Sequence, residues 1–108
     1  MISFDDFKKL DIKIGEVISA ERVLDTDKLI RLMVDVGEEE NRQIISGIAE
    51  YVEADALVGR KFPFVTNLEP RIIRGFESNG MILAVSSKNG EFSFLEPSSD
   101  IPVGSEAK

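Results

Sequence analysis

Apolar and polar positions alternate most regularly in the second quarter of the chain. Apolar side chains occupy every second position over residues 30–36, with Ile30, Leu32, Val34 and Val36 on one side. This alternation is typical of a β-strand with one buried and one exposed face. Gly37 and the glutamates after it predict a charged, solvated hairpin tip, and residues 42–46 are expected to return as the next strand.

Three other stretches show weaker strand patterns. Residues 12–23 are rich in β-branched side chains and predict a first strand with a bend or bulge at Gly15. Residues 61–66 predict a fourth strand, in which Pro63 favours an edge or a bulge. Residues 81–86 and 91–95 predict two further strands, and the Asn-Gly pair between them is a strong signal for a two-residue hairpin turn.

Two short helices are expected. Ser3, with Asp6 three residues later, is a good N-cap for a helix over about residues 3–10. Residues 47–58 have apolar positions spaced for one helix face, with Ser46 as a possible N-cap. Three strands, a helix and further strands predict an all-β fold with one domain over residues 1–108. The expected architecture is a five-stranded OB-fold barrel with a helix between strands 3 and 4, a short N-terminal helix and a C-terminal extension.

Composition argues against several classes of function. The chain has no histidine and no cysteine, so the most common general base and the thiol nucleophile are both absent. Its carboxylate clusters fall in expected surface turns, and no phosphate-binding glycine loop precedes a helix. We therefore expect a non-catalytic binding module without a metal or cofactor. The chain has no long apolar run, so no membrane partner is expected. The lack of cysteine fits a reducing compartment, and a cytoplasmic location is expected.

Net charge is an objection to nucleic-acid binding, because the chain carries −7 overall. The charge is uneven, however. Residues 1–59 carry 7 Lys and Arg against 14 Asp and Glu, and residues 75–108 carry 2 against 5. Residues 60–74 carry four cations against one glutamate, a local net charge of +3. Together with Lys28, Arg31 and Arg42, this segment would form a cationic stripe on an acidic body if the chain folds them onto one face.

The most informative segment is residues 67–81, which read N-L-E-P-R-I-I-R-G-F-E-S-N-G-M. Its proline and two glycines predict a held turn that leads into a strand. Arg71 and Arg74 offer planar forks of donors that suit phosphate oxygens, and Asn67 and Ser78 can bond to sugar, phosphate or base edges. An alternative is that the arginines pair with carboxylates of this acidic chain while Asn67 and Ser78 satisfy turn backbone.

This segment resembles the N-L-x-P-R-x-[IL]-R-G-x-x-S-x-G-M signature of the tRNA-binding domain of methionyl-tRNA synthetases and of free-standing tRNA-binding proteins. Residues 4–15, 27–29, 34–37 and 42–48 resemble other motifs of the same family, so the similarity covers nearly the whole chain. The resemblance implies structure-specific binding of tRNA by a homodimer. The tRNA contacts that it implies are Lys28, Arg42, Ser46, Asn67, Arg71, Arg74, Ser78 and Met81.

Some alternatives stay open at this stage. Met81 could equally be a core residue, and Ser46 could simply cap the following helix. The stretch Leu24-Asp25-Thr26 replaces a His-Pro or similar pair of many family members, so no role is transferred to that loop. The protein could act free-standing or as an auxiliary partner of a methionyl-tRNA synthetase catalytic chain. The rival function is that of a peptide-binding secretion chaperone with the same fold, which lacks the signature of residues 67–81.

Overall fold

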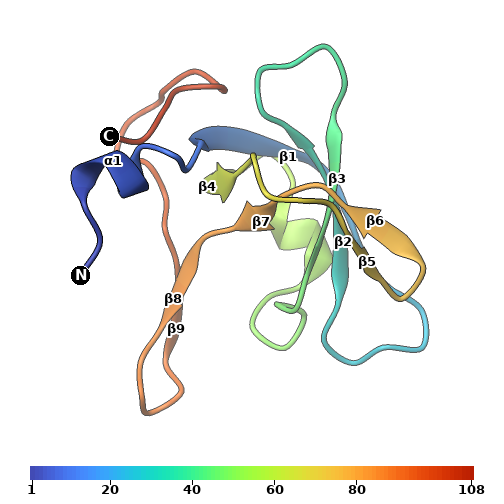
Figure 1. The fold of residues 1–108 in the computed structure, drawn as a ribbon. Coiled ribbons are helices and arrows are strands. Elements are labelled where there is room, and N and C mark those ends of the chain that lie inside the picture. The colour runs from blue at the N-terminus through green and yellow to red at the C-terminus, as the bar shows by residue number, and fades with distance from the viewer.

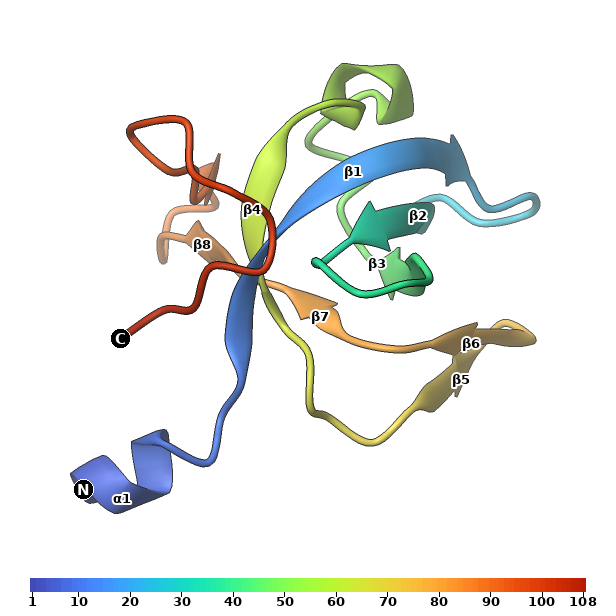
Figure 2. The ribbon, with the colours of Figure 1, turned by 90° about the horizontal axis from the view of Figure 1, so that it is seen from above.

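The computed structural model describes residues 1–108, and an antiparallel sheet that curls into a barrel forms its centre (Figures 1 and 2). The five strands lie in the order β3-β2-β1-β4-β7, and the edge strands β3 and β7 approach each other, so the barrel is nearly closed. These strands are β1 (Ile12–Arg22), β2 (Ile30–Asp35), β3 (Arg42–Ser46), β4 (Lys61–Val65) and β7 (Met81–Ile82). The mainly β, five-stranded barrel expected from the sequence is confirmed.

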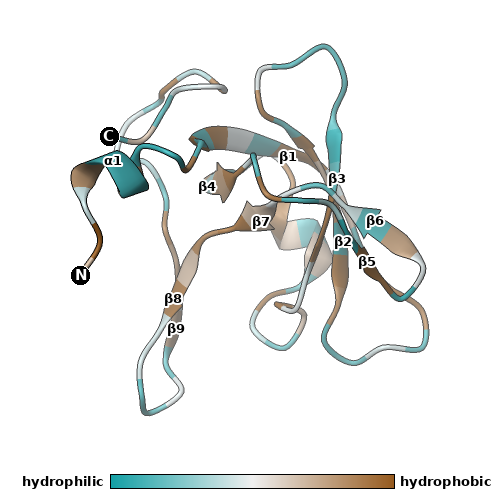
Figure 3. Ribbon diagram, viewed as in Figure 1, coloured by the Kyte–Doolittle hydropathy of each residue, from teal (hydrophilic) through white to brown (hydrophobic).

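The barrel interior is apolar because alternate residues of the strands point inward. On β2 the expected alternation is observed, with Ile30, Leu32 and Val34 fully buried. Phe62 and Phe64 of β4 are also fully buried and are the bulkiest side chains of the core. In Figure 3 the visible parts of β4 and β7 are brown, whereas the loop between β2 and β3 is largely teal. Burial of these side chains is the main stabilising term of the fold.

The long strand β1 joins the two halves of the barrel. Its first part pairs with β4 and its second part with β2, and the register shifts between Val17 and Ser19. The sequence predicted the bend or bulge at Gly15, but the register shift lies two to four residues later in the strand. Gly15 is needed for a different reason: a Cβ there would lie 2.7 Å from Val34 Cγ1 and 2.9 Å from both Phe64 Cδ1 and Val36 Cγ1.

The helix predicted over residues 47–58 is wrong in extent and type. The chain forms turns after β3, and only η1 (Ala54–Leu57), a 3₁₀ helix, is helical. Two tertiary contacts hold the preceding residues elsewhere: the Ala49 amide donates to the Lys28 carbonyl over 2.9 Å, and the Tyr51 ring stacks on Phe92 at 4.2 Å. Ser46 consequently ends β3 and caps no helix. Tertiary packing overrides the helical periodicity here.

The N-terminal helix α1 (Phe4–Phe7) is shorter than expected but begins where the sequence predicted. The Ser3 hydroxyl accepts from the Asp6 amide over 3.1 Å, and the Asp6 carboxylate accepts from the Ser3 amide over 3.4 Å. This reciprocal pair is the acidic capping box that was predicted. The hydrogen bond from the Ser3 amide, together with one from the Lys9 side chain, favours the charged carboxylate and lowers the pKa of Asp6.

Two small hairpins extend from the barrel on different sides (Figure 1). The segment expected as a turn leading into a strand is itself a hairpin, β5 (Arg71–Ile73) and β6 (Phe76–Ser78). Beyond β7, the strand expected over residues 81–86 leaves the main sheet as β8 (Ala84–Ser86) and pairs with β9 (Phe92–Phe94).

The β8–β9 hairpin is confirmed, but its turn is longer than the two residues predicted. The amide of Ser87 donates to the carbonyl of Glu91 over 2.8 Å, which leaves three residues in the loop. Gly90 has a φ of 90°, whereas Asn89 keeps a negative φ. The loop is thus a three-residue turn with glycine in the left-handed position.

The C-terminal stretch covers the open edge of β1. The Gly104 amide donates to the Ile14 carbonyl over 2.8 Å. The Ile14 amide donates to the Ser105 carbonyl, and the Ala107 amide donates to the Ile12 carbonyl, each over 2.9 Å. These bonds satisfy backbone groups that an edge strand would otherwise expose. Neither α1 nor η1, each four residues long, has the length of a membrane-spanning helix.

Candidate nucleic-acid interface

Hairpin β5–β6 is held firmly against the barrel by polar contacts with β3. Ser78 is only 5% exposed, and its hydroxyl accepts from the Ile45 amide over 3.0 Å and donates to the Gly80 carbonyl over 3.3 Å. The side-chain amide of Gln43 donates to the Glu77 carbonyl over 2.9 Å, and the Asn79 amide donates to the Gln43 carbonyl over 2.8 Å. The hydroxyl of Ser78 therefore positions the hairpin.

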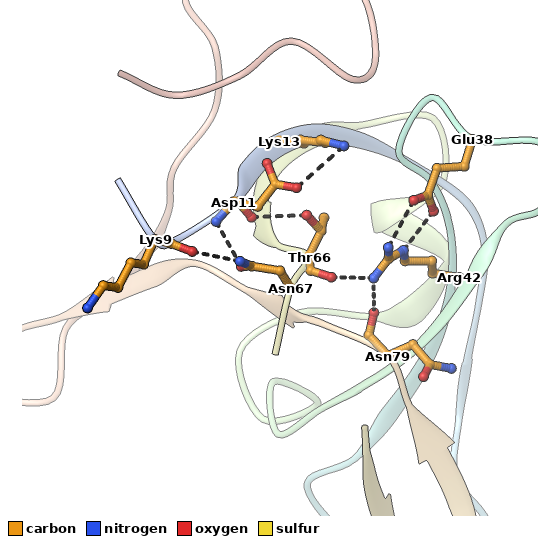
Figure 4. Close-up of polar contacts among 8 residues, drawn as sticks. All are labelled: Lys9, Asp11, Lys13, Glu38, Arg42, Thr66, Asn67 and Asn79. Atoms are coloured by element: carbon orange, nitrogen blue, oxygen red, sulfur yellow. Dashed lines mark hydrogen bonds and ion pairs between the residues drawn. The ribbon is translucent and has the colours of Figure 1, made fainter. Parts of the chain in front are cut away.

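Arg42 is a second anchor, and it joins both ends of the signature segment (Figure 4). Its Nη1 donates to the carbonyls of Thr66, over 2.5 Å, and Asn79, over 3.1 Å. Its Nε and Nη2 donate to the two carboxylate oxygens of Glu38 over 2.8 and 2.9 Å. This fork raises the pKa of Arg42 and lowers the pKa of Glu38, with the side-chain hydrogen bonds as the largest cause. All three guanidinium nitrogens are thus engaged within the protein.

Asn67 fastens the start of the segment to the chain that precedes β1 (Figure 4). Its Oδ1 accepts from the Asp11 amide over 2.8 Å, and its Nδ2 donates to the Lys9 carbonyl over 2.7 Å. The Thr66 hydroxyl adds a donated bond of 3.0 Å to the Asp11 carbonyl. The Asn67 side chain therefore satisfies backbone groups, as the alternative interpretation of the sequence expected, and its partners are 56 and 58 residues away in sequence.

Arg71 and Arg74 differ from these anchors, because neither side chain makes an ion pair or a hydrogen bond within the protein. Both residues are exposed, Arg71 at the start of β5 and Arg74 in the turn. The backbone of Arg74 has a φ of 53° and that of Gly75 a φ of 84°, the pattern of a type I′ turn. A non-glycine residue with positive φ is uncommon, and such residues occur often at functional sites. The two arginines are therefore free cations on a rigid support.

The remaining candidates, Lys28, Met81 and Ser46, have fewer contacts within the protein. Lys28 lies in the β1–β2 loop, with its Nζ 3.7 Å from Glu50, and the lysine side chain remains 72% exposed. Met81 begins β7, is 45% exposed and shares a small hollow with Arg71, so it is not a core residue. Ser46 is half-buried opposite Ile30, and its hydroxyl has no partner.

A large hollow lies beside this hairpin, and two of the residues that line it, Arg22 and Phe76, were not singled out by the sequence. It has a volume of about 480 Å³ and lies between the end of β1 and hairpin β5–β6. Its lining includes Arg22, Arg31, Arg74 and Phe76. We call it the arginine groove. Of the cations expected on one stripe, Arg31 lines this groove, whereas Arg42 is tied to Glu38. The only sequence signal for Phe76 was its place directly after the Arg-Gly turn.

Relatives of known sequence match nearly all of this chain. It is 48% identical over 104 residues to a methionine–tRNA ligase of Methanothrix thermoacetophila, covering 96% of this chain and 15% of that protein. A methionine–tRNA ligase of Deinococcus radiodurans is 44% identical over 108 residues, which is 100% of this chain and 16% of the relative. The chain thus spans about a sixth of the length of these relatives.

Solved structures share the whole fold. A methionyl-tRNA-synthetase-related protein from Pyrococcus horikoshii superposes with a TM-score of 0.94 at 37% identity, covering 100% of this chain and 98% of that one. The chaperone CsaA of Bacillus anthracis superposes with a TM-score of 0.89 at 30% identity, covering 100% and 99% of the two chains. A family model described as "Putative tRNA binding domain" matches residues 12–106. The chain therefore belongs to that tRNA-binding domain family, the one its signature segment resembles.

Proposed function

We propose that this domain binds folded tRNA through hairpin β5–β6. The observation that carries the proposal is the pair of unpartnered arginines on a rigid hairpin, within a protein whose other surface is mostly acidic. A guanidinium group binds phosphate oxygens well through its planar fork of donors. Because the hairpin is held by β3 and by Arg42, little conformational entropy would be lost when RNA binds.

The candidate residues divide into two roles under this proposal. Arg71, Arg74 and Lys28 contact the phosphate backbone, and Met81 contributes apolar contact beside Arg71. Ser46 is a further contact candidate, because its hydroxyl is free. Asn67, Ser78 and Arg42 act indirectly, since their polar atoms are used to position the hairpin. The acidic remainder of the surface would repel nucleic acid that does not match this shape.

The relatives support a non-catalytic role for this domain in a larger system. It would supply affinity for tRNA while aminoacylation takes place on a methionyl-tRNA synthetase catalytic chain, either covalently joined or separate. A cytoplasmic location follows from this role.

The second candidate function, binding of unfolded peptides, is favoured by the similarity to CsaA. An electrophoretic mobility shift with unfractionated tRNA, duplex RNA and an unfolded peptide tests both: a shift with the peptide alone would select the chaperone function.

Arg74→Ala should weaken tRNA binding by about 1 to 2 kcal/mol, because it removes a charge-assisted contact from an exposed turn. Arg71→Ala should behave alike. Affinity is measured by fluorescence anisotropy with labelled tRNA, and the thermal midpoint is measured in parallel. Lys88→Ala, in the exposed loop of hairpin β8–β9, is the charge-matched control and should leave affinity unchanged. Equal losses for Arg74 and Lys88 would show only general charge attraction and would contradict the assigned site.

Binding should also weaken with salt, to an extent set by few phosphate contacts. Three contacting cations in each chain predict a slope of about −3 per bound chain in a plot of log affinity against log salt concentration. Titrations between low and physiological ionic strength check this value. An affinity that is independent of salt, or a preference for extended single strands, would contradict the electrostatic model.

We further propose that two copies associate through the face formed by α1 and the C-terminal stretch. Phe4 is 72% exposed, and a shallow apolar hollow of about 310 Å³ is lined in part by Ile14, Leu95 and Ile101. Exposed apolar surface of this kind is typical of interfaces. Light scattering at micromolar concentration should give the mass of two chains, and the mass of one chain would overturn the proposal.

From the sequence, apolar residues at both ends of the chain predict this interface: Phe4 and Phe7 of the opening helix, and Phe92, Phe94, Ile101 and Val103 near the C-terminus. The structure argues against a part for Phe92 and Phe94. These two rings pack against each other at 4.9 Å, and Phe94 lies 5.0 Å from the core residue Phe62. They are therefore satisfied within one chain. Phe7 is half-buried, so Phe4 is the exposed aromatic residue of α1 that remains available.

A further inference from the structure

The arginine groove has the size and the surroundings of a ligand site. Its volume of about 480 Å³ falls within the range of about 300 to 1,000 Å³ that is typical of small-molecule sites. One wall is the end of β1 and the loop after it, including Leu24, which is 88% exposed. The other wall is hairpin β5–β6, which contributes Arg74 and Phe76.

The groove carries excess positive charge in a chain that is strongly acidic. Three arginines and one carboxylate, Glu21, line it. Glu21 is already paired with Arg31, whose Nη1 donates to it over 2.6 Å. Arg22 donates only to a backbone carbonyl, that of Asp27, over 3.1 Å, and Arg74 has no partner. The charges of Arg22 and Arg74 are therefore not compensated by any side chain, and an anionic group is the natural complement.

A flat platform, formed by Arg31 and Phe76, lines the same groove as these two cations. The guanidinium carbon of Arg31 is 5.5 Å from the centre of the Phe76 ring, a cation–π pair. Arg31 is held in place by Glu21 and by the Gln43 side chain, whose Oε1 accepts from Nε over 2.7 Å. Aromatic rings and arginine planes are the surfaces on which proteins stack unpaired RNA bases. The exposed face of β2 alone has no aromatic residue, and the hairpin supplies one.

We propose that the arginine groove holds one unpaired nucleotide of the RNA, with its base against the Phe76–Arg31 pair and its phosphate between Arg22 and Arg74. This inference rests on the proposed function and extends it, because it adds a single-nucleotide site to recognition of the folded RNA body. The combination of two uncompensated guanidinium groups with a stacking platform matches a nucleotide, which carries a phosphate and a flat base together. An unfolded peptide has no such obligatory pair of groups.

The test uses the full chain labelled with ¹⁵N and titrated with adenosine 5′-monophosphate. We expect the amide signals of Leu24, Arg74 and Phe76 to shift together, and inorganic phosphate at the same concentration to leave Leu24 and Phe76 unchanged. Phe76→Leu removes the ring but keeps an apolar side chain, and it should weaken binding of both the mononucleotide and tRNA by about tenfold. Phe92→Leu removes a ring from the other hairpin and should change neither affinity.

The outcomes separate this inference from the proposed function. If the wild-type protein binds tRNA but the mononucleotide leaves the groove signals unchanged, the nucleotide site is overturned and tRNA binding stands. If the wild-type protein binds no tRNA, the proposed function itself fails. An unfolded peptide that shifts the same signals, without any response to the mononucleotide, would assign the groove to polypeptide and overturn the proposal. Should Phe76→Leu not fold, the wild-type titration alone decides.

Discussion

Replacing Arg42 with alanine is expected to lower the free energy of unfolding by about 2 to 3 kcal/mol. The substitution removes the donor of two backbone carbonyls, those of Thr66 and Asn79, and leaves Glu38 without its partner. Because these carbonyls lie on either side of hairpin β5–β6 in the chain, the hairpin should also loosen, and tRNA affinity should fall together with stability. Urea denaturation measures the first effect and tRNA titration of the folded variant the second.

Glu38→Gln is the matched control for this prediction. It removes the ion pair but leaves Arg42 free to bond both carbonyls, so it should cost less than about 1 kcal/mol. The pKa of Glu38 in the folded protein is below its ordinary value of 4.5. The contribution of the ion pair is therefore complete above that value and is lost as the pH falls through the folded-state pKa. Equal losses for the two variants would show that the carbonyl contacts contribute nothing.

Gly15→Ala is expected to destabilise the barrel by about 2 kcal/mol through overpacking. The added methyl group would approach the side chains of Val34, Phe64 and Val36 to less than 3.0 Å. Phe64 and Val34 are fully buried, so they can move only by disturbing the core. The variant should show a lower midpoint of urea denaturation with an unchanged slope.

Gly47→Ala provides the comparison, because a Cβ at Gly47 meets no atom within 4 Å and the backbone there does not have positive φ. That substitution should be neutral or should stabilise by up to about 1 kcal/mol, through reduced entropy of the unfolded chain. If Gly15→Ala were equally harmless, the close packing of β1 against the core would be disproved.

The sequence predicted the barrel well because its strands carry local signals. Alternation over β2, the capping box at Ser3 and the turn-forming glycines all depend on neighbours within a few residues. The helix over residues 47–58 failed because its periodicity is overridden by distant contacts, such as that of Tyr51 with Phe92. Local patterns carry no information on such partners.

The candidate site shows the same limit. The signature correctly drew attention to residues 67–81, but the sequence left open which polar side chains are used internally. Asn67 and Arg42 find their backbone partners 24 to 58 residues away, so their anchoring roles are visible only in the folded chain. Phe76 was missed because its importance arises from the approach of Arg31 from another strand.

Both ends of the chain leave the barrel on the side away from hairpin β5–β6 (Figures 1 and 2). A larger body joined at either end would therefore leave the two free arginines accessible. Tethering converts a second binding event into an intramolecular one, with effective concentrations that reach the millimolar range for short flexible linkers. A few phosphate contacts, weak in an isolated domain, would then be enough to retain an RNA beside its tethered neighbour.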